Sequence, residues 1–105
     1  YTPLHLAARE GRADVVKLLL SHGANPLAET STGGATALHF AAQHGNPAAI
    51  AALLDAKVPV DIRESAWGQT PLMWAAAFGR VDAIDVLIKR GAGIEAASRI
   101  EDIPK

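Results

Sequence analysis

The sequence predicts a mainly α-helical solenoid in which antiparallel helix pairs stack side by side, and three observations lead to that prediction. A seven-residue segment occurs three times, at residues 2–8, 36–42 and 70–76, so that each copy begins 34 residues after the one before. A glycine follows each copy at a constant distance, and an apolar segment follows each glycine: Gly11, Gly45 and Gly79. A fixed period of roughly 20 to 50 residues is typical of proteins built from stacked repeats.

The first element of each copy is a short helix, which we expect over residues 1–10 in the first copy. Thr2 can cap the N-terminus of this helix with its hydroxyl oxygen. Pro3 suits the first helical position, where a backbone N–H would have no partner in any case. Gly11 can take the left-handed conformation that ends the helix.

The second element is an apolar helix, expected over residues 13–21 in the first copy and ended by Gly23. Because only two or three residues join it to the first helix, the two must run antiparallel. Its apolar residues lie on almost every side of the helix, so we expect burial on more than one side. Those residues are Val15, Val16, Leu18, Leu19 and Leu20.

Turn-forming residues separate the pairs, at 25–34 and again at 60–69. The second copy is the least regular one. Asn46 and Pro47 make a good helix start, but Lys57 stands where the other copies have a helix-ending glycine. A non-glycine residue in left-handed geometry costs on the order of 1 kcal/mol. The alternative is that Val58 and Pro59 reshape this turn instead. A third loop would begin at residues 94–99.

These motifs resemble those of the ankyrin repeat family: a Thr-Pro-Leu-His segment, a glycine, a Val-Val-x-Leu-Leu-Leu helix and a closing Gly-Ala. The resemblance implies one domain over residues 1–105, with repeats at approximately 1–33, 34–67 and 68–99 and a tail at 100–105. It also implies that the loops project from the helices as β-hairpin-like fingers. The chain opens inside a repeat that lacks its leading finger, so we expect it to be a piece of a longer protein.

Composition argues against several classes of function. The chain has 10 basic and 11 acidic residues and a formal net charge of −1, with no basic stripe to neutralise phosphates, so we expect no nucleic acid partner. It has no cysteine for thiol catalysis, disulfides or zinc. No apolar run approaches the roughly 20 residues that span a bilayer. We expect a soluble protein and favour the cytoplasm, although targeting signals could lie outside a fragment.

No group of residues predicts an enzyme, a cofactor or a metal site. His5 and His39 are equivalent, and the resemblance implies that each bonds its repeat's threonine and nearby backbone. His39 and His44 are five residues apart on a helix, so they cannot share a metal ion well. Met73 replaces the third histidine and should lack its ring hydrogen bonds.

The resemblance implies a surface that binds another protein, formed by the finger tips and by the two positions before each first helix's glycine. Trp67 and Phe78 are its most suggestive members, because aromatic residues are enriched among interface hot spots. Trp74 aligns with Leu6 and Phe40, so we interpret it as a packing residue. The candidate partner-binding residues are Arg9, Glu10, Gln43, His44, Ala77 and Phe78 on the helices and Thr32, Ala35, Trp67 and Gln69 on the fingers.

Two functions remain open from the sequence. The first is a non-catalytic module that binds another protein through a concave groove. The alternative is a structural spacer or cap within a longer chain that binds nothing in trans. Terminal repeats usually carry a polar outer face, and the ends of this chain are apolar. We therefore expect either missing neighbours or self-association through an uncapped end.

Overall fold

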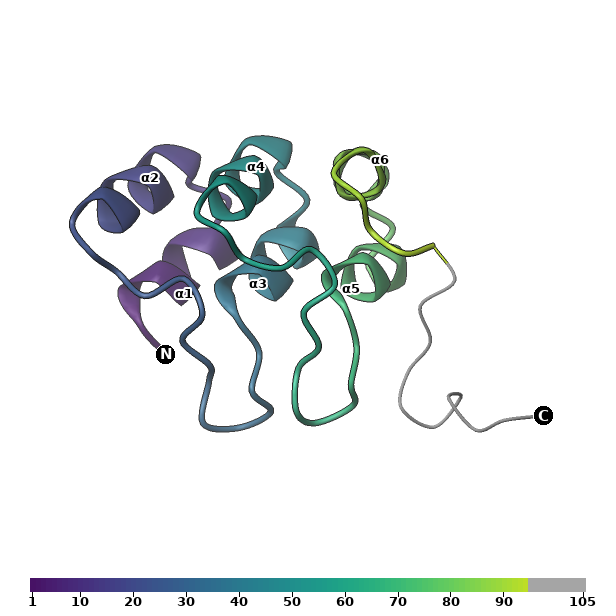
Figure 1. The fold of residues 1–105 in the computed structure, drawn as a ribbon, viewed down its shortest axis with the longest axis horizontal. Helices are drawn as coiled ribbons and strands as arrows, with labels where there is room; N and C mark the ends of the chain where they lie inside the picture. Colours follow the sequence, from purple (N-terminus) through teal and green to yellow (C-terminus); the bar gives the residue numbers. More distant parts are fainter. Residues whose placement is uncertain (95–105) are drawn as a thin grey trace.

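The computed structural model describes residues 1–94, in which six helices form three antiparallel pairs (Figure 1). The first helices of the pairs make an inner row next to the fingers, and the second helices make an outer row. This is the predicted solenoid, whereas the expected third finger and the tail lie outside the described residues. The pairs are α1 (Pro3–Arg9) with α2 (Ala13–Ser21), α3 (Ala37–His44) with α4 (Pro47–Asp55), and α5 (Pro71–Ala77) with α6 (Val81–Lys89).

Equivalent threonines begin the inner helices, as predicted. The Thr2 hydroxyl accepts a hydrogen bond from the His5 amide at 3.3 Å, and the Thr70 hydroxyl accepts one from the Met73 amide at 3.3 Å. In the first copy the bond is reciprocal, because the Thr2 amide donates to Nδ1 of His5 at 3.0 Å. Met73 has no ring to return that bond, so the third copy keeps only half of the capping box.

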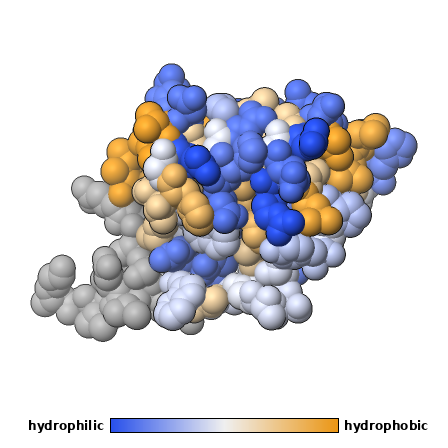
Figure 2. Space-filling model, turned by 180° about the vertical axis from the view of Figure 1, so that it is seen from behind, coloured by the Kyte–Doolittle hydropathy of each residue, from blue (hydrophilic) through white to orange (hydrophobic). Residues whose placement is uncertain are grey.

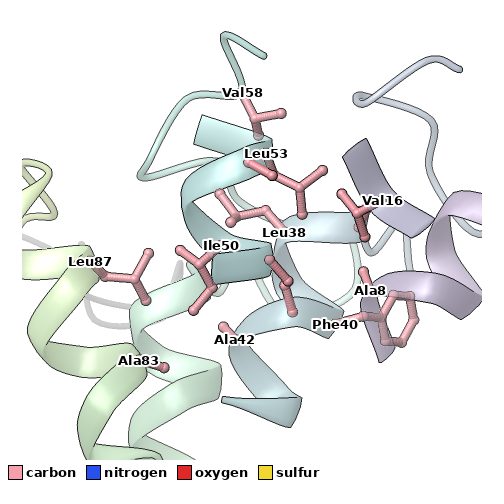
Figure 3. Packing of buried hydrophobic residues seen from close by; sticks show 14 of the residues in the cluster. Ala8, Val16, Leu38, Phe40, Ala42, Ile50, Leu53, Val58, Ala83 and Leu87 are labelled. Atoms are coloured by element: carbon pink, nitrogen blue, oxygen red, sulfur yellow. The ribbon is translucent and has the colours of Figure 1, made fainter. Parts of the chain in front are cut away.

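Small residues let the inner helices approach one another closely. Ala8 and Ala42 are fully buried between neighbouring pairs. Ile50 and Leu53 of α4 and Leu87 of α6 lie in the same core (Figure 3). The core is therefore continuous along the stack, as expected where a single helix pair cannot bury its own apolar side.

The expectation that α2 is buried on more than one side holds only in part. Val16 is its only fully buried residue, while Val15 is exposed and Leu18 has 59% of its surface exposed. α2 packs against α1 of the inner row and against α4 beside it in the outer row, and its remaining sides are exposed. An apolar pattern on every side of a helix does not say which side a neighbour will cover.

The fingers turn back on themselves below the inner row (Figure 1). In the first finger the Thr30 amide donates to the Ala35 carbonyl at 3.0 Å, and in the second the Glu64 amide donates to the Gln69 carbonyl at 3.0 Å. Their hairpin-like form thus rests on equivalent turn hydrogen bonds, and no strand is assigned within residues 1–94.

Buried histidines attach the fingers to the inner helices, as the resemblance implied. The Thr36 amide donates to Nδ1 of His39 at 3.2 Å, so the opposite ring nitrogen carries the proton. That nitrogen, Nε2, donates to the Gln69 carbonyl at 2.9 Å. In the preceding copy, Nε2 of His5 lies 2.8 Å from the Ala28 carbonyl. Each ring therefore connects a helix start to the finger that follows its own helix pair.

The two ends of the stack are apolar. From behind, hydrophobic surface gathers at the α1–α2 end and at the α5–α6 end, with hydrophilic surface between them (Figure 2). Leu6 and Val15 are exposed at the first end, while their equivalents Phe40 and Ala49 are buried inside the stack. Each end therefore presents the kind of face that a neighbouring helix pair covers elsewhere in the molecule.

Lys57 takes the left-handed conformation, which is the first of the two alternatives that the sequence left open for this turn. Its φ is +75°, and within the described residues it is the only non-glycine residue with a positive φ. Its equivalents Gly23 and Gly91 have φ values of +92° and +99°. The repeat geometry at this turn therefore overrides the local preference of a lysine backbone.

Replacing Lys57 with glycine should stabilise the domain by about 0.5–1 kcal/mol, because glycine adopts this conformation without strain. Urea unfolding followed by circular dichroism measures the difference. Lys17→Gly is the matched control: Lys17 is exposed within α2, and glycine should cost about 1 kcal/mol there. A Lys57→Gly variant that is less stable than the parent would contradict the strain at this turn.

Stability should also depend on the protonation of His39. Burial lowers the pKa of His39 below its ordinary value of 6.5, against opposing effects from hydrogen bonds to carbonyls and from nearby carboxylates. Below about pH 6.5 the unfolded chain therefore binds a proton that the folded chain resists. The free energy of unfolding should be highest above that pH and should fall as the pH drops below it.

Urea unfolding at several values between about pH 7.5 and about pH 5.5 tests this dependence. The His39→Gln variant should be less stable at the upper pH but should lose less stability on acidification. His22→Gln, which changes an exposed histidine, should lose as much as the parent. An equally steep loss in the His39→Gln variant would assign the effect to other groups.

Candidate functional site

A buried carboxylate organises the second finger. Glu64 is only 3% exposed, and its Oε1 accepts hydrogen bonds from the Trp67 amide at 2.8 Å and the Gln69 amide at 3.2 Å. Its Oε2 accepts a third from Nε1 of Trp74 at 3.2 Å. A buried charge needs such partners to offset the loss of water. Because Trp74 belongs to α5, the carboxylate also fixes the finger against the inner row.

Aromatic rings form a row along the inner helices. The rings of Tyr1 and Phe40 meet edge to face with centroids 5.4 Å apart, and those of Phe40 and Trp74 do the same at 5.7 Å. His39 lies 5.2 Å from Trp74. Trp74 is half-buried and packs against the core, which confirms its interpretation as a packing residue.

Two further aromatic side chains are exposed beside this row. Trp67, on the second finger, has 67% of its surface exposed, and Phe78, at the end of α5, has 48% exposed. No ring contact joins Phe78 to Trp74 in the described part of the chain, although both lie on one side of α5. Phe78 is thus exposed, as are Glu10 and His44 at the equivalent positions of the first two copies.

These side chains surround two neighbouring hollows that share Glu64, Trp67 and Trp74. We call the larger the Phe78 hollow; it measures about 290 Å³, and the remaining residues that line it are Gln43, Gln69, Ala77 and Phe78. We call the other the aromatic hollow; it measures about 270 Å³, and its remaining lining residues are Tyr1, Phe40, Thr30, Thr32, Gly33, Ala35 and Ala66. Both lie between the fingers and the inner helices.

The structure brings seven of the ten candidate residues to these hollows. Five of them line the Phe78 hollow, namely Gln43, Trp67, Gln69, Ala77 and Phe78. Trp67 also lines the aromatic hollow. Thr32 and Ala35 line the aromatic hollow alone, and Ala35 is itself buried, so it offers little surface for contact. The second finger and the last two inner helices therefore hold most of the predicted surface.

The other three candidates lie elsewhere. The Arg9 guanidinium lies 5.1 Å from the centre of the Tyr1 ring. Glu10 belongs to the apolar end of the stack, where it lines a surface with Leu6. His44 packs over Gly11, since a Cβ added to that glycine would come within 2.2 Å of the imidazole. Arg9, Glu10 and His44 are not part of either hollow.

Gln43 carries an unsatisfied acceptor in this region. Its Oε1 is buried and has no donor among residues 1–94. Its backbone carbonyl is occupied, because it accepts a hydrogen bond from Nε of Arg80 at 2.8 Å. A buried acceptor without a partner is uncommon and calls for an explanation.

Sequence reasoning missed three contributors to these hollows. Glu64 aligns with Thr30, and nothing local marks it as the support of a finger. Tyr1 and Phe40 were not assigned to the surface, because their convergence with Trp67 depends on how the fingers lie side by side. The Ala66 amide donates to the Gly33 carbonyl at 3.0 Å and joins the two fingers there.

Residues 1–94 contain no group of three or more histidine, cysteine, aspartate or glutamate side chains placed to hold a metal ion. None of the six helices has the length and apolar character needed to cross a membrane.

Comparison with known protein families identifies the repeats. A model for three copies of ankyrin repeats matches residues 26–98, and a model for a single ankyrin repeat matches residues 1–31. Together the matches span all three helix pairs. They cover both fingers and every residue that lines the two hollows.

Matches to individual proteins are short. The chain is 56% identical over 34 residues to zygote-specific protein 3 of Chlamydomonas reinhardtii, which is 32% of this chain and 9% of that protein. It is 73% identical over 26 residues to the putative E3 ubiquitin-protein ligase XBAT35 of Arabidopsis thaliana, which is 25% of this chain and 6% of that protein. It is 65% identical over 26 residues to a 2-5A-dependent ribonuclease of Mus musculus, which is 25% of this chain and 4% of that protein. The chain thus spans less than a tenth of each relative.

Removing the carboxylate that supports the second finger should destabilise the domain. Glu64→Ala leaves two backbone amides and the Trp74 indole without their acceptor, which should cost about 1–3 kcal/mol. Thermal and urea unfolding measure the loss. Glu29→Ala is the matched control, because Glu29 is an exposed carboxylate on the first finger and its removal should change stability by less than about 0.5 kcal/mol. Equal effects of the two substitutions would contradict the supporting role of Glu64.

Proposed function

Because the chain belongs to the ankyrin repeat family, we propose that it is a non-catalytic module that binds another protein through the surface between its fingers and its inner helices. Ankyrin repeats generally mediate interactions between proteins. The observation that carries the proposal for this chain is the pair of exposed aromatic side chains, Trp67 and Phe78, which border one hollow from two different elements.

The surroundings of these two residues support their role as anchors. Hot spots in protein interfaces are enriched in aromatic residues that fill or border well-packed pockets. Trp67 extends from a finger whose backbone Glu64 fixes, and Phe78 ends a helix whose start Thr70 caps. Little conformational freedom would be lost on binding, because the elements that carry the anchors are already ordered.

The unsatisfied acceptor of Gln43 gives the surface a polar feature as well. Its Oε1 has no donor among residues 1–94, and the residue lines the same hollow as Phe78. We infer that a donor on the partner, such as a backbone amide, bonds this oxygen after a small rotation of the side chain. A polar group at this place would orient a partner that the aromatic residues hold.

A second copy of the chain is the other partner that we consider. The exposed Leu6 and Val15 at one end, and Ile88 at the other, support self-association through an uncapped end. A further repeat of a longer chain would cover the same faces equally well. Self-association therefore stays a prediction, separate from the surface around Trp67 and Phe78.

The anchors are tested with the Trp67→Ala and Phe78→Ala substitutions made together. A partner is first captured from an extract of the source cells, and its affinity for the purified chain is then measured by titration calorimetry. We expect the double variant to bind at least about 10-fold more weakly, since truncating a hot spot typically costs more than 1 kcal/mol.

Leu18→Ala is the control, because Leu18 is an exposed apolar residue on the outer row, away from both hollows. It should leave the affinity unchanged. An affinity that the double variant retains would contradict the proposed surface. An intact chain that captures no partner would favour a structural spacer.

A further inference from the structure

We propose that the aromatic hollow receives a methylated ammonium group, the head of a methylated lysine side chain on the partner. The inference rests on the proposed function, since this cation would belong to a bound protein. The hollow itself can be examined with a small cation alone. Four aromatic side chains and one buried carboxylate carry the proposal.

The four rings come from four parts of the fold and line one hollow of about 270 Å³. Tyr1, Phe40 and Trp74 form the row along the inner helices, with successive centroids 5.4 and 5.7 Å apart. Trp67 lines the same hollow from the second finger. The face of an aromatic ring carries negative charge, and cages of such rings recognise quaternary ammonium groups.

Trp67 is the ring most available to a ligand. It is 67% exposed, and within residues 1–94 neither an aromatic ring nor a guanidinium lies against it. Its position is nevertheless fixed, because its backbone amide donates to the Glu64 carboxylate at 2.8 Å. An exposed indole on a fixed backbone can close over a ligand with only a side-chain rotation.

The carboxylate of Glu64 gives the hollow its charge preference. It lines the hollow and is 3% exposed, so little water screens its negative charge. Three N–H groups already donate to its two oxygens. A primary ammonium group has three donors that must find acceptors, and the occupied carboxylate serves them poorly. A methylated ammonium keeps the positive charge with fewer donors or none, and its methyl groups suit the aromatic walls.

One cation–aromatic contact already exists beside this hollow. The Arg9 guanidinium lies 5.1 Å from the centre of the Tyr1 ring, and one of its nitrogens donates to the Tyr1 hydroxyl at 3.4 Å. Arg9 does not line the hollow itself. Tyr1 is therefore already in contact with a cation, and Phe40 is only 7% exposed, so the half-buried Trp74 and the exposed Trp67 offer most of the aromatic surface to a cation supplied by a partner.

The test uses the whole chain and three small probes. Tetramethylammonium chloride is titrated into isotopically labelled protein at constant ionic strength, and the indole N–H signals of Trp67 and Trp74 are followed by NMR. tert-Butanol is the neutral probe of the same shape, and methylguanidinium chloride represents an arginine side chain. We expect saturable shifts of both indole signals with tetramethylammonium, with an affinity at least about 10-fold above that of either other probe.

Trp67→Ala should weaken tetramethylammonium binding by at least about 5-fold, as read from the remaining Trp74 signal. Leu18→Ala should leave it unchanged. Both positions are exposed, so both variants should fold, and their thermal unfolding verifies this.

Three outcomes would overturn the assignment. Equal binding of tert-butanol would make the hollow a plain apolar site, and tighter binding of methylguanidinium would make it an arginine site. The absence of saturable shifts would exclude a cation site altogether.

A failure of the proposed cation site can be distinguished from a failure of the proposed protein-binding function. If tetramethylammonium does not bind while the Trp67 and Phe78 double variant loses its partner, the module stands and the cation site does not. If tetramethylammonium binds while the double variant keeps its partner, the hollow binds a small cation, but neither the proposed protein-binding surface nor a methylated lysine of that partner as its ligand stands.

Discussion

The close contact between neighbouring inner helices is the constraint on which the rest of the structure depends. Alanines at equivalent positions, Ala8 and Ala42, are fully buried there, so the helix backbones can approach one another. The fingers extend from these helices, and the same approach brings one finger against the next, where Ala66 and Gly33 share a hydrogen bond. A larger side chain at the alanine positions would separate the helices and, with them, the walls of both hollows.

The surface arises where the copies differ, whereas the scaffold arises where they agree. Thr30 and Glu64 are equivalent and make the same backbone turn, but only Glu64 reaches the indole of the next inner helix. Gly33 and Trp67 are equivalent too, and only the second offers an aromatic ring. Because the repeated hydrogen bonds maintain the fold, residues at such positions can change without altering the stack. The candidate surface is therefore concentrated between the second and third copies.

Local features were the ones that the sequence predicted best. The threonine caps, the bounds of α2 and the exceptional turn at Lys57 each depend on a few neighbouring residues and on the comparison of three copies. The burial of α2 was overestimated, since the apolar pattern of a helix does not show which of its sides neighbouring helices cover. The convergence of Tyr1, Phe40 and Trp67 could not be predicted from the sequence, because it depends on how the fingers and the inner helices lie side by side.

The free-energy cost of burying the Glu64 carboxylate indicates that the second finger has a role beyond stability. A threonine makes the equivalent turn at position 30, so the finger fold itself does not require a carboxylate. A buried charge is a poor choice for stability alone, since its loss of hydration must be offset by several donors. Glu64 has three donors, and one of them is the indole that lines both hollows. Its charge therefore lies at the wall of both hollows, where the proposed cation would meet it, and a turn residue chosen only for stability would not need that position.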